Sequence, residues 1–516
     1  MLNAKDNMRK NGPVCKVCGT QLFSDSVFCE QCGAPVNRKE KLDDNLCFDV
    51  FSSSDWENRW AEICGSRKNR KTGIIITNTR NCPDADSFLE VLNDYFFWVS
   101  KNCNVDYYLF DLRTQCVSDN YDQVIDVLRI IRDAGKADYH LIVGDEKTIE
   151  PFVFDNYCAD NDDEVVSDLP YMTLDPSNPF DGIEGIIVDS FIQTGRIPAF
   201  SGDNFDLAVE YMINRMGIEN ESANKEFGLS AEVWKSESKH VFSEFSSETL
   251  LESPPVDLDS KKLEDTISPD ARLLYFNLHG SDQTEYWYGQ IGYSYPKAAE
   301  PYSFDNMIPG YFIGVEACYG AAFAERDEDS SILKRVLKNG CLAFLGSSAI
   351  AYGTSEEPGS AADIIVGSFL KSVSSGKTAG DAYIAGITDL LMQEVEDVEI
   401  KTLLEFALYG DPSTTVIQSK PRFGWSLDVP NLQINIPDIV SVSKTTFAKV
   451  DKKVQKTIND YVYAKYSLFS NAKPSTYTTS KGDYQSIFKK RIGGFDNFLK
   501  IYYDKNGKVR KECHSK

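Results

Sequence analysis

Histidine and cysteine are the residues of this sequence whose positions suggest proton transfer and nucleophilic chemistry. The chain contains four histidines, and His279 is the one that ends an apolar run and precedes a glycine. A second apolar run, residues 311–317, leads directly to Cys318, which is followed by Tyr-Gly. Parallel strands present the residues at their carboxyl ends to a ligand crevice. A thiol and an imidazole at neighbouring strand ends are the components of an activated cysteine nucleophile, and we expect this chemistry here.

Four further cysteines are spaced as ligands for a metal ion. Two Cys-x-x-Cys pairs, separated by ten residues, are formed by Cys15, Cys18, Cys29 and Cys32. Each pair can place two sulfurs on one ion, and together they complete the tetrahedral site that zinc prefers. We therefore expect a structural zinc ribbon over residues 12–37. The remaining cysteines are scattered without a disulfide-like spacing, which indicates reduced thiols in a reducing compartment.

Length and charge narrow the class of protein. A chain of 516 residues is long enough for about three domains. Its net charge of -24 argues against general binding to nucleic acid and favours basic peptides or partners. Neither a secretory leader nor an apolar run long enough to cross a membrane is evident in the sequence. The expectation is a soluble cytoplasmic protein that does not contact membranes.

The middle of the chain reads as an α/β fold. Residues 38–70 are charged and without pattern, and we expect a linker. Apolar strands then alternate with amphipathic helices over 71–225 and again over 226–420. This alternation predicts mostly parallel sheets flanked by helices, arranged as two tandem layers: an N-terminal α/β subdomain and a second subdomain that carries His279 and Cys318.

The last part of the chain, residues 421–516, is predicted to form a small α+β module. A helix is expected over 446–465, and Asn506-Gly507 predicts the turn of a hairpin. Residues 471–516 contain eleven Lys or Arg against four Asp or Glu, which inverts the charge of the rest. This basic surface would either complement the acidic body or bind an external partner.

Six short motifs, in order along the chain, resemble the caspase-like cysteine peptidases, and several of them resemble the gingipain-like branch. They are residues 141–145 (LIVGD), 167–171 (SDLPY), 195–198 (GRIP), 279–280 (HG), 317–320 (ACYG) and 408–413 (LYGDPS). The resemblance spans about residues 71–418 and implies a cysteine endopeptidase acting on protein or peptide substrates. It assigns Cys318 as nucleophile, His279 as general base and acid, and the N–H groups of Gly280 and Cys318 as the oxyanion hole.

Glu316 is the candidate for substrate specificity. Residues i and i+2 share a face of a strand, so Glu316 should point the same way as Cys318. In the families that the chain resembles, this position lines the pocket for the residue before the cut. A carboxylate there favours Arg or Lys by a charge-assisted pair. Legumain-like enzymes also carry an acid at this position and cut after Asn, so cleavage after Asn or Asp stays open.

Other assignments are less specific. Glu232 or Glu237 could orient His279 as a third catalytic group, because the family's first strand of this layer often ends near a carboxylate. The acidic stretch that contains Asp160, Asp162 and Asp168 could bind calcium, as in some gingipain-like enzymes. The flanking modules suggest regulation through a protein partner of the zinc ribbon or the C-terminal module. The alternative is a latent or non-catalytic caspase-like scaffold in which these modules bind partners.

Overall fold

The computed structural model describes residues 50–67, 70–115, 121–175, 186–187, 190–199, 205–218, 225–416, 433–434, 447–479 and 481–516. The expected zinc ribbon and its four cysteines lie outside these residues, as does nearly all of the segment between 417 and 446. Among the described helices, none combines the length and the apolar character needed to cross a membrane.

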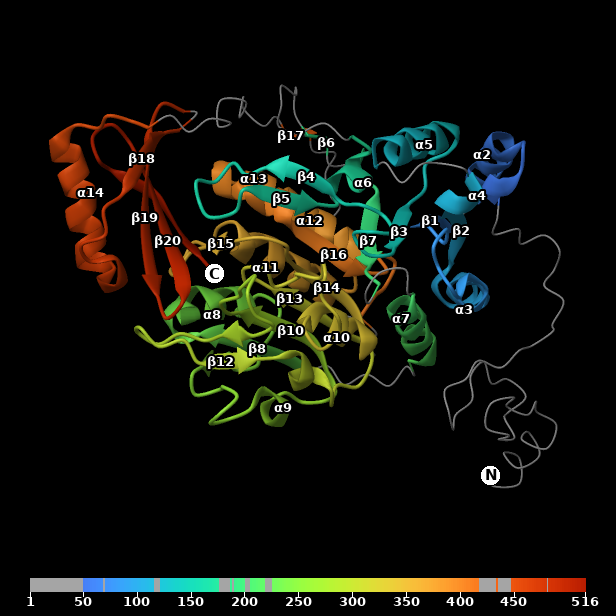
Figure 1. The fold of residues 1–516 in the computed structure, drawn as a ribbon, viewed down its shortest axis with the longest axis horizontal. Helices are drawn as coiled ribbons and strands as arrows, with labels where there is room; N and C mark the ends of the chain where they lie inside the picture. The colour runs from blue at the N-terminus through green and yellow to red at the C-terminus, as the bar shows by residue number, and fades with distance from the viewer. Residues whose placement is uncertain are drawn as a thin grey trace.

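A single ten-stranded sheet forms the centre of the protein (Figure 1). In spatial order its strands are β2 (Val105–Asp111), β1 (Lys71–Thr77), β3 (Tyr139–Val143), β7 (Gln193–Ile197), β16 (Phe406–Gly410), β14 (Cys341–Ser347), β13 (Tyr311–Val315), β10 (Ala271–Asn277), β8 (Lys225–Ala231) and β9 (Leu251–Ser253). All neighbouring strands are parallel except β14 and β16. The mostly parallel α/β sheet expected from the sequence is therefore present.

The expectation of two tandem layers needs correction, because both halves of the chain belong to the same sheet. The strand β16 comes late in the chain and pairs with β7 of the first half through Tyr409 and Arg196. On its other side β16 pairs in antiparallel fashion with β14 of the second half. The sequence pattern does not show that this strand inserts between the two halves and joins them.

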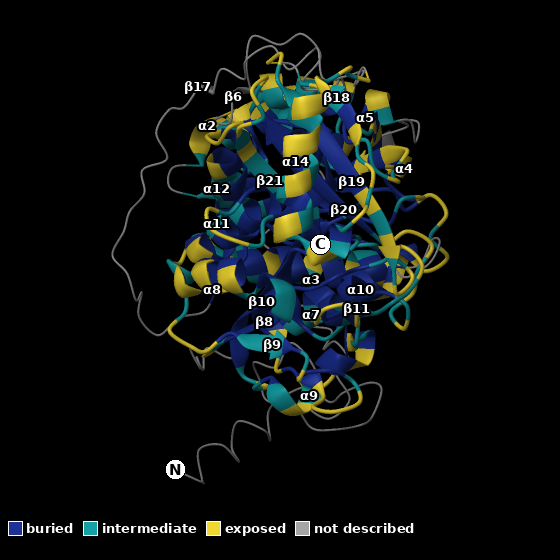
Figure 2. Cartoon of the chain, turned by 90° about the vertical axis from the view of Figure 1, so that its left-hand side faces the viewer, coloured by how far each residue is buried: buried dark blue, intermediate teal, exposed yellow. Residues whose placement is uncertain are grey.

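Helices cover both faces of the sheet, and β1 is accordingly buried on both sides. Ile74 and Ile76 pack into one hydrophobic cluster and Ile75 into another, and Figure 2 shows this buried interior. The first face is covered by α2 (Trp56–Ser66), α5 (Tyr121–Ala134), α8 (Lys235–Ser243), α11 (Ala362–Ser374), α12 (Ala379–Leu391) and α13 (Asp397–Glu405). The second face is covered by α3 (Ala85–Cys103), α7 (Asp206–Gly217), α9 (Leu263–Thr266) and α10 (Ile332–Lys338).

Part of the predicted linker is packed against the sheet domain. Residues 50–66 form the turn η1 (Val50–Ser52) and the helix α2, and Val50 and Phe51 are buried. Trp60 is fully buried, and its Nε1 donates to the carbonyl oxygens of Ile131 and Gly135 at 3.1 and 2.6 Å. Because most of this stretch is charged, its sequence pattern did not indicate that a few apolar residues pack against the sheet domain.

Short elements complete the domain and carry the loops. They are α4 (Leu112–Gln115), β4 (Phe152–Asp155), β5 (Glu164–Ser167), α6 (Leu169–Thr173), β6 (Ile186–Ile187), η3 (Glu232–Trp234), β11 (Trp287–Tyr288), β12 (Lys297–Ala299), η4 (Pro301–Phe304), β15 (Tyr352–Gly353) and β17 (Gln433–Ile434).

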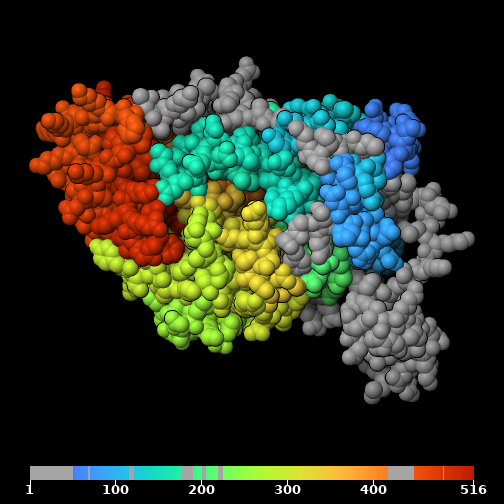
Figure 3. Space-filling view, in the orientation of Figure 1, coloured from blue at the N-terminus to red at the C-terminus, as the bar shows by residue number. Residues whose placement is uncertain are grey.

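Residues 447–516, here called the C-terminal module, combine a helix with an antiparallel sheet. Its elements are α14 (Lys452–Lys465), η6 (Ser467–Phe469), β18 (Ser475–Thr478), β19 (Tyr484–Ile492), β20 (Phe495–Tyr503) and β21 (Val509–Ser515). The turn between β20 and β21 contains Gly507 at a positive φ of 83°. The sheet gains a fifth strand, β15, from the body of the protein. Figure 3 shows the module, in red, lying directly against the teal and yellow-green segments of the body.

Candidate active site

The parallel pairing of β10 and β13 brings the predicted histidine and cysteine to one edge of the sheet. Phe276 in β10 is paired with Val315 in β13. His279 and Cys318 each lie three residues beyond these paired positions. Both apolar strands are buried along their whole length, which fixes the register of the two strand ends.

Gly280 and Cys318 are in direct backbone proximity. A Cβ atom on Gly280 would lie 1.7 Å from the carbonyl oxygen of Cys318 and 3.3 Å from Cβ of Ala317. Since neither contact distance can be relieved by rotating a flexible side chain, only glycine fits at this position. Neither the N–H of Gly280 nor that of Cys318 makes a backbone hydrogen bond within the described residues. These two donors are therefore available to a ligand.

The ring of His279 is held in one orientation by its neighbours. Its Nε2 lies 2.7 Å from Oε1 of Gln290, whose amide nitrogen donates to the carbonyl oxygen of Gly292 at 3.0 Å. With the amide oriented in this way, Nε2 carries the proton and Nδ1 is left as the basic nitrogen. Trp234 packs against the imidazole with ring centroids 4.3 Å apart.

Burial keeps the imidazole neutral. It lowers the pKa of His279 to about 4, because the charged form loses hydration. The hydrogen bond to Gln290 and a backbone hydrogen bond with Lys516 raise this pKa, while the positive charge of Lys516 lowers it. At neutral pH the ring can therefore accept a proton.

Cys318 is enclosed, with 5% of its surface exposed. Its Sγ lies 3.6 Å from the carbonyl oxygen of Ala351. Burial raises the pKa of the Cys318 thiol, and the nearby carboxylate of Glu405 raises it further. The thiol packs in a cluster that includes Phe498 and Tyr502 of the C-terminal module. In this state the thiol is neutral and is covered by the module.

Glu316, two residues before Cys318, belongs to a buried site around the Lys516 ammonium. It is fully buried, and its Oε1 accepts a hydrogen bond of 2.6 Å from the hydroxyl of Tyr275. Nζ of Lys516 lies 3.2 Å from Oε2 of Glu316 and 2.9 Å from Oδ1 of Asp363. The same ammonium donates to the carbonyl oxygen of Thr354 at 3.2 Å and lies 4.8 Å from the ring centre of Trp234. The pocket thus surrounds a lysine ammonium with two carboxylates, a carbonyl and an aromatic face.

The electrostatics of this pocket depend on the bound lysine. Burial raises the pKa of Glu316 well above its ordinary value, the Lys516 ammonium lowers it, and neighbouring Asp363 raises it. Asp363 is positioned by two backbone donors, because its Oδ2 accepts from the N–H groups of Thr354 at 2.7 Å and Ser360 at 3.1 Å. Two carboxylates therefore share one cation.

Sequence reasoning missed four residues of this site: Trp234, Gln290, Asp363 and Lys516. Asp363 lies in the first turn of α11, where an acid has the ordinary role of interacting with the helix dipole. A weak signal was available, since Asp363 is the sole charged residue before Lys371 in an otherwise apolar helix. Lys516 is far from the other three along the sequence, and no local pattern connects them.

The predicted third group, Glu232, is engaged elsewhere. Its carboxylate pairs with Nζ of Lys235 at 2.8 Å and is 30% exposed. The side chain that holds the imidazole is Gln290. Glu237, the other candidate, lies under the loop at Gly359, where a Cβ would come within 2.6 Å of its Oε1.

Three of the acidic residues considered for calcium, a set that also includes Asp163 and Glu164, pair with protein cations. Asp160 and Asp162 contact Nζ of Lys401 at 2.8 and 2.6 Å, and Asp168 pairs with Arg196 at 2.6 Å. Within the described ranges, no cluster of three or more His, Cys, Asp or Glu has an arrangement suited to a metal ion.

A mostly parallel α/β sheet with a cysteine and a histidine at adjacent strand ends has the parts of a cysteine peptidase. The family model of peptidase family C25 matches residues 73–417, and the chain belongs to this family. It is a cysteine-type endopeptidase related to the gingipains.

Two solved structures resemble the chain. One is the Arg-specific cysteine proteinase gingipain R (RgpB), at 11% identity and a TM-score of 0.47, covering 87% of this chain and 98% of that one. The other is the complex of the pro- and mature domains of RgpB from Porphyromonas gingivalis, at 12% identity and a TM-score of 0.48, covering 86% of this chain and 99% of that one. A search among curated proteins found no match.

Proposed function

We propose that this peptidase cuts peptide bonds after lysine or arginine, with Cys318 as the nucleophile and His279 as the general base and acid. The observation that carries the proposal is a lysine ammonium enclosed by two acidic residues. Glu316 lies two residues before Cys318, and Asp363 lies in the first turn of α11. Charge-assisted pairing with a buried carboxylate favours a basic side chain over a neutral one.

The proposed reaction uses the groups at the two strand ends. Nδ1 of His279 accepts the proton of the Cys318 thiol while Sγ attacks the carbonyl carbon of the residue bound in the pocket. The N–H groups of Gly280 and Cys318 stabilise the resulting oxyanion. His279 then gives its proton to the leaving amine as the C–N bond breaks, and a thioester remains on Cys318.

Water completes the cycle. His279 takes a proton from the water molecule that attacks the thioester and returns it to Sγ as the carbon–sulfur bond breaks, which releases the carboxylic acid and restores the thiol. The hydrogen bond from Nε2 to Gln290 keeps Nδ1 directed to this task in both halves of the reaction.

Cleavage of a peptide library tests the proposal. The library varies the residue before the cut, and the purified chain is compared with its Cys318→Ala and His279→Ala variants. The expected result is cleavage after Lys and Arg by the unaltered chain and loss of cleavage, by at least about a thousandfold, in both variants. The same assays are run in the Lys516→Glu background, because the Lys516 ammonium pairs with Glu316 and Asp363 in this structure.

A matched control is Cys341→Ala. Cys341 is also a fully buried thiol of the same sheet, and its Sγ lies 3.3 Å from the carbonyl oxygen of Ala343. This variant should retain activity. Unchanged cleavage by Cys318→Ala would remove Cys318 from the mechanism, and cleavage after Asn or Asp alone would remove the basic specificity.

The flanking regions are proposed to regulate the peptidase. The zinc ribbon expected from Cys15, Cys18, Cys29 and Cys32 stays a prediction from their spacing. Elemental analysis of the purified chain should give one zinc ion, which is lost in a Cys15→Ser/Cys18→Ser variant. Zinc content that is unaffected by this double substitution would contradict the assignment.

A further inference from the structure

The end of β21 occupies the pocket that the proposed function assigns to the substrate. Lys516 follows this strand and is 1% exposed. Its ammonium contacts Glu316, Asp363 and the carbonyl oxygen of Thr354. A side chain from the C-terminal module therefore lies among residues of the body, and Figure 1 shows the C-terminus reaching this junction beside β15.

The backbone of the same segment is bound as an added strand. Residues Ser515 and His514 pair in antiparallel fashion with Tyr352 and Gly353 of β15, and the N–H of Lys516 donates to the carbonyl oxygen of Ala351 at 2.9 Å. Addition of an extended segment to a free strand edge is a common way of binding peptides, because main-chain hydrogen bonds give affinity and pockets give specificity.

The backbone of Lys516 lies between the two proposed catalytic groups. The carbonyl oxygen of Ala351 is contacted by both Sγ of Cys318, at 3.6 Å, and the N–H of Lys516, at 2.9 Å. The backbone of Lys516 also lies close enough to the His279 imidazole to raise its pKa. Lys516 thus shares a backbone acceptor with the thiol, lies near the imidazole and fills the specificity pocket, as expected of the residue before the cut.

We propose that residues 513–516 are an intramolecular inhibitor: they bind the cleft as the acyl side of a substrate does, with Lys516 in the specificity pocket, and cleavage of other peptides requires Ser515 and Lys516 to be displaced. This inference rests on the proposed function. It also names the preferred substrate class, peptides with lysine before the cut and a small residue such as serine before that lysine.

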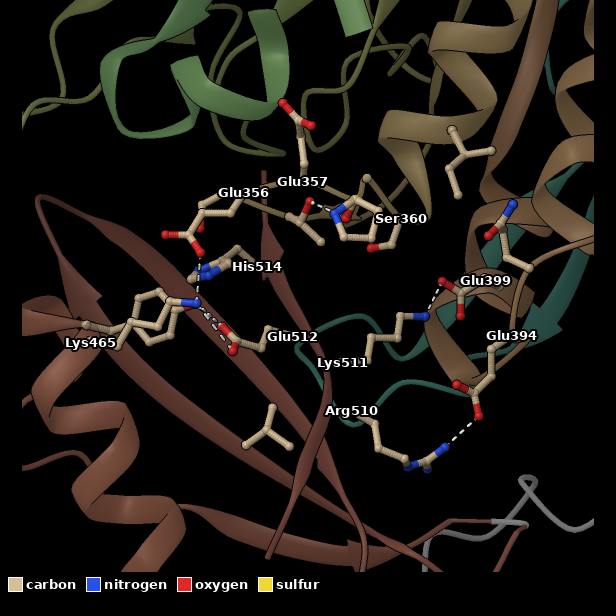
Figure 4. Close-up of a pocket in the computed structure, with 18 of the residues that line it drawn as sticks. Glu356, Glu357, Ser360, Glu394, Glu399, Lys465, Arg510, Lys511, Glu512 and His514 are labelled. Carbon is tan, nitrogen blue, oxygen red and sulfur yellow. Dashed lines mark hydrogen bonds and ion pairs between the residues drawn. The ribbon is translucent and has the colours of Figure 1, made fainter. Parts of the chain in front are cut away.

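The module has the contacts needed to hold this segment in place. Lys500 pairs with Asp397 at 2.8 Å in a fully buried site. Figure 4 shows three further pairs across the junction, around a hollow of about 510 Å³: Lys465 with Glu356, Lys511 with Glu399, and Arg510 with Glu394. The basic module thus complements acidic residues of the body, and the segment reaches the cleft from an anchored base.

The segment itself is attached more weakly than the module. β15 is two residues long, so the pairing with β21 covers only Tyr352 and Gly353. Cys513 and His514 are also paired with Lys500 and Leu499 of β20, inside the module's own sheet. Ser515 and Lys516 lie beyond these pairs, so they can leave the cleft while the module stays folded and docked.

Tethering makes even a weak ligand an effective inhibitor. A segment held near its site has an effective concentration in the millimolar range, so a sequence that binds with a Kd of about 0.1 mM would occupy the cleft about ten- to hundredfold more than it leaves it free. Removing the segment should increase the rate constant kcat/KM by the same factor.

The first experiment compares Lys516→Glu with Lys505→Glu. Lys505 is an exposed lysine in the β20–β21 turn, which makes it a matched control of equal charge change. In Lys516→Glu the new carboxylate is repelled by Glu316 and Asp363, and kcat/KM for a lysine peptide should rise about ten- to hundredfold. Lys505→Glu should match the unaltered chain. Equal, Cys318-dependent activity in all three proteins would overturn the inference and leave the proposed function standing.

The second experiment does not depend on catalysis. A fluorescent peptide with the sequence of residues 510–516 is titrated into Cys318→Ala and into Cys318→Ala/Lys516→Glu, with fluorescence anisotropy as the readout. The double variant should bind at least about tenfold more tightly, because its cleft is free. Equal affinities of the two variants for the peptide would overturn the inhibitor assignment, whether or not the protein cleaves peptides. Absence of cleavage by every protein would instead count against the hydrolytic mechanism.

Discussion

Two buried sites in this protein each enclose a cation among carboxylates, and they differ in how the charges are balanced. In the first, which we call the joint, the Arg215 guanidinium of α7 pairs with one carboxylate, that of Asp411, just beyond β16. In the second, the specificity pocket, the Lys516 ammonium pairs with two carboxylates, those of Glu316 and Asp363.

The joint is saturated with hydrogen bonds. Asp411 accepts from the hydroxyls of Tyr95 at 2.5 Å and Tyr107 at 2.6 Å and from the N–H of Ser413 at 2.7 Å. Burial would raise the pKa of Asp411, but Arg215 and these donors hold it below its ordinary value. A one-to-one pair with every oxygen satisfied is a permanent part of the fold.

The specificity pocket contains more acidic groups than cations. Oε2 of Glu316 makes no hydrogen bond within the described residues and depends on the ion pair with Lys516. Glu237 adds a third buried acid nearby, whose pKa is raised to about 7 by burial and by Asp363 and is lowered by Lys516. The joint takes its cation from α7 of the sheet domain, whereas the cation of the pocket comes from the end of the C-terminal module.

Removing the cation of the joint should have the largest effect. Arg215→Leu leaves Asp411 as an uncompensated buried charge, and we expect a loss of about 3–5 kcal/mol in the free energy of unfolding. Urea denaturation followed by circular dichroism measures it. The control Arg132→Leu removes an arginine paired at the surface with Asp133 and should change stability by less than about 0.5 kcal/mol. Near-normal stability of Arg215→Leu would erase the distinction between the two sites.

Neutralising the acids of the pocket should change specificity more than stability. Asp363→Asn or Glu316→Gln, each in the Lys516→Glu background, should lower kcat/KM for lysine peptides about ten- to hundredfold, since one charge-assisted contact of about 1.5–3 kcal/mol is lost. Peptides with a neutral residue before the cut should lose less. The exposed acid Glu248 provides the control substitution Glu248→Gln. An undiminished preference for lysine in both pocket variants would refute the role of these carboxylates.

The excess of acidic groups in the specificity pocket should also cause a small pH dependence of the melting temperature. The pKa of Glu237 in the folded protein, about 7, lies above its ordinary value of 4.5, so the folded state holds this proton more tightly than the unfolded state. Its contribution to stability is complete below pH 4.5 and is lost as the pH rises through 7. Glu237→Gln should therefore raise the melting temperature by about 2 °C at pH 8 and leave it unchanged at pH 4.5. A gain confined to low pH would contradict the assigned direction.

Local patterns predicted much of the fold. The apolar strands that lead to His279 and Cys318, the helix expected over 446–465 and the Asn506-Gly507 hairpin all follow from periodicity and turn residues, and the structure contains each of them, with the helix at Lys452–Lys465. The apolar runs of β10 and β13 also implied a shared sheet edge, which the pairing of Phe276 with Val315 shows.

Long-range pairings were beyond these patterns. Nothing in the composition of 406–410 indicates that it lies between β7 and β14, because any short buried strand has the same appearance. The motifs at 167–171 and 195–198 likewise gave no sign that Asp168 and Arg196 meet in a buried ion pair. The specificity pocket draws Trp234, Glu316, Asp363 and Lys516 from four separate segments, so only the folded chain reveals it.

The insertion of β16 between the two halves has a mechanical consequence. A hinge between subdomains needs a line along which few contacts must break, yet here that line is crossed by a strand hydrogen-bonded on both sides. The sheet that carries the thiol and the imidazole is therefore rigid, because rotation of one half against the other would break the hydrogen bonds of β16. The contact that can open most easily is the short pairing between β15 and β21. A force or a binding partner that pulls on the C-terminal module would therefore act on this pairing first.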